Sequence, residues 1–264
     1  MQSWIAFTNA IAWSKRESKQ ASQWASQPGI GVEHCWRNQA SQESETDTPV
    51  NIGNGPYRDN GEGVAARPLP YPLILTKNAS VQRDFDLIEA YRDRVLVGLS
   101  LTGTHAKEGE LAAIERNASR IRERMAVPEE AHRRGLRTYG MLCPLLLGIA
   151  DDEKSVTDLV RFCLSCGTEE VFVEPVNPRG PGLRLVQEAL DAGGFTAVAK
   201  AVGNVRNHRA WSTYCTTLVN TVQQVMDRAG AIEKLRFLLY RSNLQENDLR
   251  RIREHDLGIQ WLGK

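Results

Sequence analysis

The chain has 264 residues, of which 41% are hydrophobic. This is enough for a sizeable core, either in one α/β-barrel-like domain or in a smaller domain with appendages. The formal net charge is +1, so no overall field draws the protein towards nucleic acid or a membrane, and phosphate-backbone binding would require a local basic patch. The sequence contains five cysteines. This odd count, without a secretory signal or a long apolar span, predicts reduced thiols and a cytoplasmic protein.

The composition changes near Pro68, and this change divides the chain into two parts. Residues 1–67 are rich in Ser, Gln, Asn, Glu and Gly, and such a segment buries too little apolar surface to offset its chain entropy. We expect it to be loosely ordered, with Trp4, Trp13, Trp24 and Trp36 as the residues that could dock a weak helix (Ile5–Trp24) onto the remainder. Residues 68–264 are expected to form the folded part.

From residue 70 onwards, apolar runs alternate with segments of helical periodicity. The predicted strands are Leu73–Lys77, Val95–Thr102, Thr138–Cys143, Glu170–Asn177, Leu235–Tyr240 and Gly258–Leu262. The predicted helices are 81–91, 119–134 with a bend at Pro128, 151–167, 183–190, 195–229 and 246–255. Strand and helix alternating at this spacing indicate a parallel sheet, in which ligands gather at the carboxyl ends of the strands.

Polar residues stand at the ends of the first four of these strands. They are Lys77 and Asn78, Ser100 and Thr102, Cys143, and Glu174 and Asn177. A lysine and a carboxylate that face the same strand ends could pair, or could hold the ammonium and carboxylate of an amino-acid-like ligand. Alternatively, these polar residues mark only the points where strands reach solvent.

The turn Pro144–Glu153 offers a second candidate site. Gly148 would let the backbone approach a ligand closely, and the apolar backbone up to Ile149 is a plausible shelf for an adenine ring. The alternative is an ordinary loop between a strand and a helix.

Other potential sites are weaker. Cys163 and Cys166 form a CxxC pair in the last turns of a predicted helix, where small buried thiols are the favoured interpretation over metal or redox chemistry. No histidine has a partner at metal-ligand spacing, so no metal site is predicted. The basic residues between Arg116 and Arg137 alternate with glutamates, which favours a solvated helix face.

Taken together, these segments resemble the radical S-adenosylmethionine (SAM) superfamily, in particular proteins related to spore photoproduct lyase. The resemblance covers roughly residues 68–264, and it is carried by the order and spacing of a few segments. These are Leu73–Asn78 with Val81–Ile88, Val97–Thr102, Ile114–Met125, Gly135–Pro144 with Gly148–Asp151, and Glu170–Asn177.

The resemblance implies a partial (β/α) barrel that binds SAM across the strand ends and holds a 4Fe–4S cluster for reductive SAM cleavage. In that case Ser100 and Thr102 would contact SAM or substrate, and Gly148 and Ile149 would lie near the adenine. Lys77, Asn78, Glu174 and Asn177 would line the cavity.

The chain departs from the family in one chemical respect. Three cysteines in a CxxxCxxC motif hold the cluster and leave one iron free for SAM, but this sequence has no such triplet and retains only Cys35 in comparable surroundings. The first strands of the barrel are also missing, which would leave the strand Leu73–Lys77 as an unprotected edge of the sheet. We expect this edge to be covered by the tryptophan-bearing N-terminus, by a partner chain or by solvent.

Three functions follow from these observations. The first is radical SAM chemistry on an unknown substrate. The second is a cluster-less, catalytically inactive relative that binds a nucleotide-like ligand or a protein partner. The third is an aldolase- or hydrolase-type barrel in which Lys77 forms a Schiff base.

Overall fold

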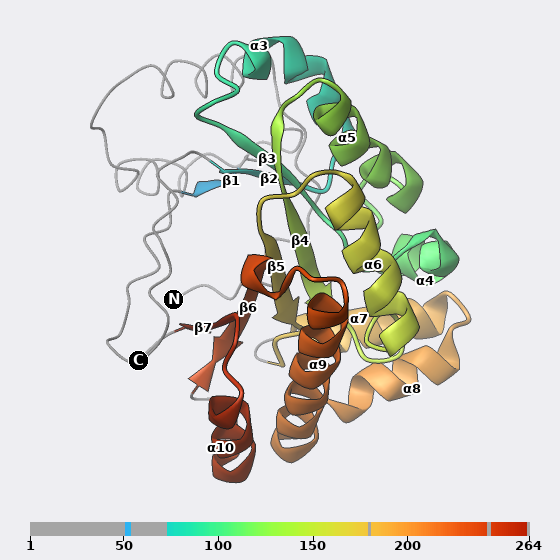
Figure 1. Ribbon diagram of the computed structural model, residues 1–264. Helices are drawn as coiled ribbons and strands as arrows, with labels where there is room; N and C mark the ends of the chain where they lie inside the picture. The colour runs from blue at the N-terminus through green and yellow to red at the C-terminus, as the bar shows by residue number, and fades with distance from the viewer. Residues whose placement is uncertain (1–50, 54–72, 179–180, 242–243, 263–264) are drawn as a thin grey trace, which may run out of the picture.

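The computed structural model describes residues 51–53, 73–178, 181–241 and 244–262. These residues form an α/β fold in which one sheet carries helices on one side (Figure 1). The predicted boundary near residue 68 and the proposed docking of the tryptophans lie outside the described residues. No helix within the described ranges combines the length and the apolar character required to cross a membrane.

The sheet contains seven strands whose spatial order follows the chain. They are β1 (Asn51–Gly53), β2 (Leu73–Thr76), β3 (Leu96–Ser100), β4 (Arg137–Leu145), β5 (Val171–Pro175), β6 (Leu235–Tyr240) and β7 (Ile259–Leu262). Strands β2 to β7 run parallel, each beside its predecessor. All six predicted strands are therefore confirmed, with shifts of a few residues at their ends. Parallel strands in sequential order, with helices on one face, are compatible with a partial barrel.

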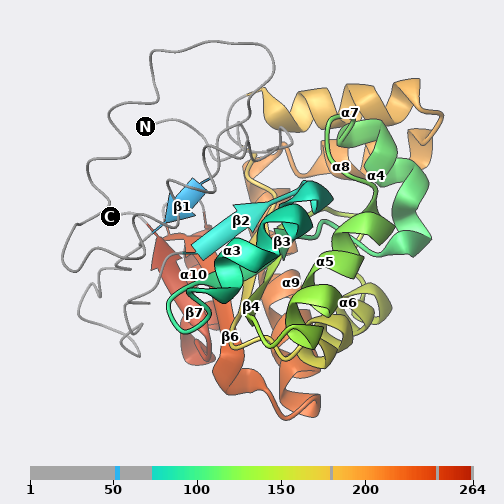
Figure 2. The same ribbon diagram turned by 90° about the horizontal axis from the view of Figure 1, so that it is seen from above.

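The edge of β2 is covered by a strand from the N-terminal segment, in line with the expectation that this edge needs a cover. Strand β1 pairs antiparallel with β2, with Asn51 opposite Leu75 and Gly53 opposite Leu73. The two strands lie side by side in both views (Figure 2). A segment predicted to be loosely ordered thus supplies the neighbour, because backbone hydrogen bonding needs no apolar side-chain pattern.

The helical segments connect these strands and mostly match the expected ranges. They are η3 (Ala79–Asp84), α3 (Phe85–Glu89), η4 (His105–Lys107), α4 (Glu108–Ile114), α5 (Ile121–Arg133), α6 (Glu153–Ser165), α7 (Gly182–Ala192), α8 (Thr196–Asn204), α9 (His208–Arg228), η5 (Ile232–Lys234) and α10 (Glu246–Glu254). Helix α5 continues through Pro128.

The long helical stretch predicted over 195–229 is divided into two helices, because the chain breaks between α8 and α9. Asn207 begins α9 as its N-cap, and its side chain accepts hydrogen bonds from the backbone N–H groups of Arg209 and Ala210. These capping hydrogen bonds start a new helix at Asn207, although the helical periodicity of the sequence continues through it. As a result α8 turns to lie beside α7 (Figures 1 and 2).

The main core lies between the sheet and its helices. Alternate residues of β4, β5 and β6 pack there against the apolar faces of α6 and α9. Trp211, on α9, is the largest side chain in this core that is fully buried, and its indole Nε1 donates a hydrogen bond to the carbonyl of Val176 at 2.6 Å. Helix α9 is thereby fixed to the chain that leaves the carboxyl end of β5.

The opposite face of the sheet, called here the inner face, carries a smaller apolar cluster. Its buried members are Leu96, Tyr139, Met141, Phe172 and Leu238, all from strands. The Tyr139 ring lies across Gly98, where a Cβ atom would come within 2.5 Å of it. Apolar side chains thus occupy the inner face towards the amino ends of the strands, and the polar residues follow at the carboxyl ends.

Candidate functional site

The polar residues at the ends of four parallel strands converge on one site. Lys77 follows β2, Ser100 ends β3 and Thr102 follows it, while Cys143 lies in β4 and Glu174 in β5. All except Cys143 are buried, and Cys143 is half-buried. The expectation that these strand ends share one site is met for these five residues.

Lys77 is the centre of the hydrogen-bond network. Its ammonium contacts a carboxylate oxygen of Glu115 and donates to the hydroxyl of Thr102 at 3.0 Å and to the carbonyl of Cys143 at 3.5 Å. An ammonium has three N–H donors, so these contacts account for all of them. Lys77 therefore ties β2 to β3 and β4 at their carboxyl ends.

Glu115 and Arg124 complete this network, and sequence reasoning missed both. Glu115 follows α4, and its second carboxylate oxygen accepts a hydrogen bond from Arg124 at 2.5 Å. Arg124 also donates to the carbonyl of Ser100 at 2.9 Å. Both residues belong to the run of alternating basic and acidic residues around 115–137, for which the sequence predicts a solvated helix face. Arg124 is nevertheless only 1% exposed.

A signal for Arg124 was present in the sequence. The buried positions of α5 include Ile121, Arg124, Val127 and Ala131. Arg124 thus lies on the apolar stripe of its helix, at the spacing of residues that face the core. A charge in such a stripe indicates a buried partner.

The two cations set the protonation of Glu115. Burial by itself would raise the pKa of Glu115, but the charges of Lys77 and Arg124 and the hydrogen bonds from Lys77 and Thr102 lower it to about 2. The Thr102 hydroxyl donates to the carboxylate at 2.7 Å. Glu115 is therefore ionised at neutral pH, and it keeps its two cationic neighbours paired.

This lowered pKa predicts a specific acid dependence of stability. Because the folded-state pKa of Glu115 lies below the unfolded value, its contribution is present above about pH 4 and is lost as pH falls towards about 2. Chemical unfolding of the wild type and of Glu115→Gln, followed by circular dichroism between pH 5 and pH 2, tests this. The stability difference between the two proteins is expected to shrink as pH falls; a constant difference would contradict it.

Cys143 and Glu174 form a second pair beside this network. The Cys143 thiol donates to a carboxylate oxygen of Glu174 at 3.0 Å. Burial raises the pKa of Glu174 above its ordinary value, an effect that the thiol hydrogen bond partly offsets. Burial and the neighbouring carboxyl raise the pKa of Cys143 well above that of a free thiol. Burial thus disfavours the charged form of each side chain as long as no opposite charge lies beside it.

Two further predicted residues, Asn78 and Asn177, lie in the chain that leaves β2 and β5. The Asn78 side chain caps η3 by accepting a hydrogen bond from the backbone N–H of Ser80 at 2.9 Å. Asn177 is half-buried and follows Val176, the residue after β5. Asn78 has a local structural role, and Asn177 follows the chain segment that Trp211 holds in place.

Gly148 and Ile149 lie in the turn that follows β4, and each packs against the helical side of the sheet. Ile149 is completely buried in the main core, so its side chain offers no surface for an adenine ring. Gly148 adopts a φ of +79°, and a Cβ added there would lie 3.4 Å from Ala201 of α8. Glycine is therefore favoured at this position because of the positive φ angle, and the residue lies against helix α8.

The described cysteines do not fit an iron–sulfur cluster. Cys163, Cys166 and Cys215 are buried, and Cys163 and Cys215 belong to the core on the helical side of the sheet. Burial raises the pKa of Cys163 to about 12 and that of Cys166 to about 11. Cys143 is the one described cysteine in the strand-end network, and a cluster needs three thiolates together. Cys35 lies outside the described residues, and within them no group of three metal-binding side chains occurs.

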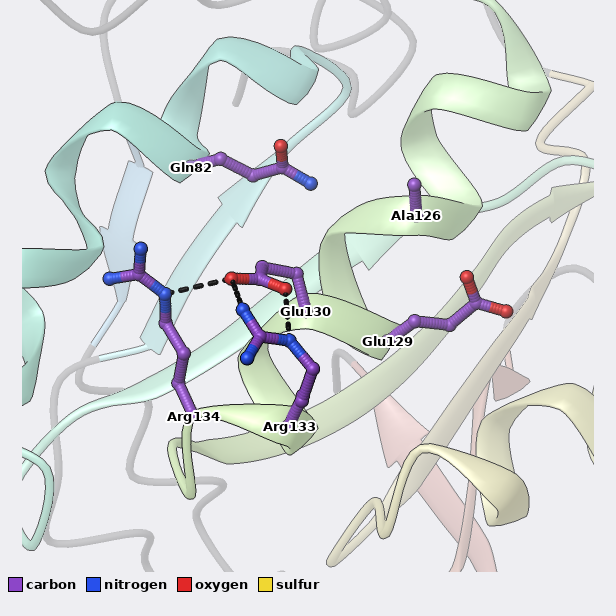
Figure 3. A pocket seen from close by; sticks show the side chains of 6 residues that line it. All are labelled: Gln82, Ala126, Glu129, Glu130, Arg133 and Arg134. Carbon is purple, nitrogen blue, oxygen red and sulfur yellow. Dashed lines mark hydrogen bonds and ion pairs between the residues drawn. The ribbon is translucent and has the colours of Figure 1, made fainter.

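A separate shallow groove lies between η3 and α5. It has a volume of about 430 Å³ and is lined by Gln82, Ala126, Glu129, Glu130, Arg133 and Arg134 (Figure 3). Glu130 pairs with both arginines, at 2.5 Å from Arg133 and 2.9 Å from Arg134. The solvated ion pairs predicted for this run are therefore present here, although Arg124 is an exception.

Comparison with known proteins adds little to this geometry. No family model matches the chain, and no solved structure matches it. The chain is similar to the uncharacterized protein ORF301 of Acidianus two-tailed virus, with 26% identity over 121 residues. The matched stretch is 45% of this chain and 40% of the viral protein, so it spans less than half of either.

Proposed function

We propose that this protein binds SAM or a similar adenosyl ligand at the carboxyl ends of β2–β5, as a relative of the radical SAM proteins without a cysteine-held cluster. The observation that carries the proposal is the convergence of Lys77, Ser100, Thr102, Cys143 and Glu174 on one site. In parallel α/β folds this end of the sheet is where ligands bind. The same fold without a cluster would be a binding protein rather than a radical enzyme, and we place it in the cytoplasm.

The roles of the residues follow from their contacts. The paired charges of Lys77, Glu115 and Arg124 hold the ends of β2, β3 and α5 in a fixed arrangement. Cys143 and Glu174 remain as the polar pair towards the ligand. Lys77 is held by Glu115, Thr102 and the carbonyl of Cys143, so its nitrogen is not placed to attack a carbonyl group, as a Schiff-base mechanism requires.

The alternative function is reductive cleavage of SAM by a 4Fe–4S cluster, which the sequence resemblance implies. The described residues do not bring together the three cysteine thiolates that would hold this cluster, so no reaction step is assigned to it. The balanced net charge of +1 gives no reason to propose nucleic acid as a partner. A partner chain at the edge of β2 is not proposed either, because β1 occupies that edge.

Two measurements on the full chain test the proposal. Isothermal titration calorimetry is expected to detect SAM binding by the protein as purified, without iron. Anaerobic iron–sulfur reconstitution followed by iron analysis and visible absorbance near 400 nm is expected to give no stoichiometric cluster. Failure of SAM and of 5′-methylthioadenosine to bind would contradict the proposal, whereas a stoichiometric cluster with SAM cleavage would establish the alternative.

A further inference from the structure

The charged side chains at the strand ends differ in how many hydrogen-bond and ion-pair partners they have. This difference indicates which kind of ligand the site can bind. The Lys77 ammonium has three acceptors, namely Glu115, Thr102 and the carbonyl of Cys143. Its ion-pair partner is Glu115, whose single negative charge it shares with Arg124. Lys77 therefore has no N–H left to donate to an anionic ligand.

Arg124 is also unsuited to binding an anion. Its side chain is 1% exposed, and two of its nitrogens donate to Glu115 and to the carbonyl of Ser100. An incoming carboxylate or phosphate could reach this guanidinium only by displacing Glu115. Breaking a buried ion pair in this way leaves an uncompensated charge.

Of the two carboxyl groups in the site, Glu174 has the weaker hydrogen-bond partner. Among the residues that the structure describes, its hydrogen-bond partner is the Cys143 thiol, which is a weak donor. Glu174 is 5% exposed, while Cys143 beside it is half-buried and so gives access from solvent. A buried carboxyl with one weak donor gains strongly from a cationic partner.

The surroundings of Glu174 suit a cation as well. Phe172 lies two residues earlier on the same strand and face, with its ring edge-to-face against Tyr139 at 5.7 Å between centroids. Aromatic rings and a carboxylate side by side favour positively charged groups over anionic ones.

We infer that the site recognises its ligand through a positively charged group, a sulfonium or an ammonium, held against the Glu174 carboxylate. This inference rests on the proposed function, since it specifies which end of an adenosyl ligand the strand ends bind. It also excludes phosphate-bearing nucleotides as the preferred ligands of this site.

Calorimetry with three adenosyl ligands tests the inference. SAM carries a sulfonium and an ammonium, S-adenosylhomocysteine keeps only the ammonium, and 5′-methylthioadenosine carries neither. Each is titrated into the wild type, Glu174→Gln and Glu170→Gln. Glu170 is the matched control, because it lies just before β5 at the amino end of the sheet, paired with Arg236 at 2.7 Å.

The expected result is a selective loss. Glu174→Gln should weaken SAM binding by about 10-fold or more, as expected for a charge-assisted contact, and should change 5′-methylthioadenosine binding by no more than about twofold. Glu170→Gln should bind all three ligands like the wild type. Retained 5′-methylthioadenosine binding by Glu174→Gln shows that the variant is folded.

Three outcomes would overturn the inference. Equal losses for SAM and 5′-methylthioadenosine, or no loss for either, would contradict cation recognition while leaving the proposed function intact. Binding of ATP more tightly than SAM would point to anion recognition. Failure of the wild type to bind any adenosyl ligand would contradict the proposed function and this inference together. The response of S-adenosylhomocysteine identifies the group, because it follows SAM only if the ammonium is the one bound.

Discussion

Replacing Glu115 by alanine is expected to lower the free energy of unfolding by about 3–5 kcal/mol, because it leaves Lys77 and Arg124 buried without their shared counter-charge. The loss comes from the uncompensated cations rather than from the net value of the ion pairs. Guanidinium chloride unfolding monitored by circular dichroism measures it.

Two variants control this prediction. Glu130→Ala removes a carboxylate that also pairs with two basic residues, but on the exposed side of α5, so stability is expected to remain almost unchanged. A triple replacement of Lys77, Glu115 and Arg124 by methionine removes all three charges together and is expected to cost less than Glu115→Ala alone. An equal loss in Glu130→Ala and Glu115→Ala would contradict the buried network.

Replacing Trp211 by alanine is expected to lower the free energy of unfolding by about 3–5 kcal/mol as well. Trp211 is 1% exposed, and its loss leaves a cavity between α9 and the sheet. It also removes the hydrogen bond to the carbonyl of Val176, which fixes the chain that leaves β5 beside Glu174. The same unfolding measurement applies.

The conservative and control variants separate these two contributions. Trp211→Phe keeps much of the apolar volume and loses the indole donor, so a smaller loss of about 1–3 kcal/mol is expected. Trp261→Ala, at a half-buried position of β7, is expected to cost less than Trp211→Ala. A loss below about 1 kcal/mol in Trp211→Ala would show that α9 is not anchored through this side chain.

The structure bears on the fold class that the resemblance implies, and the ligand-binding roles belong to the proposal. The parallel sheet with strands in chain order is compatible with a partial barrel. Lys77, Ser100, Thr102 and Glu174 lie together at the carboxyl ends of these strands. The side chain of Ile149 is part of the main core.

Local patterns were sufficient to predict most elements of this fold. The predicted strand Leu235–Tyr240 matches β6 residue for residue, and the predicted helix Glu246–His255 differs from α10 by one residue. Apolar periodicity is a property of residues close together in the chain, so it can be recognised without the tertiary structure. Polar residues at strand ends were visible for the same reason.

The missed features depend on contacts between distant segments. Strand β1 has no strong apolar pattern, and its pairing with β2 arises from backbone hydrogen bonds across a long separation in the chain. The pairing of Cys143 with Glu174 likewise required two neighbouring strands in register. Neither contact can be predicted from the sequence of one of the two strands alone.

The sequence by itself determined the order and type of the elements from β2 to β7 and the polar character of the strand ends. Only the tertiary structure decided which charged residues are buried. Glu115 and Arg124 belong to a run whose composition is that of a solvated surface, and their burial follows from the meeting of α4, α5 and the ends of β2 and β3. The energy of a charge is set by its surroundings, and those surroundings come from segments that the local sequence does not contain.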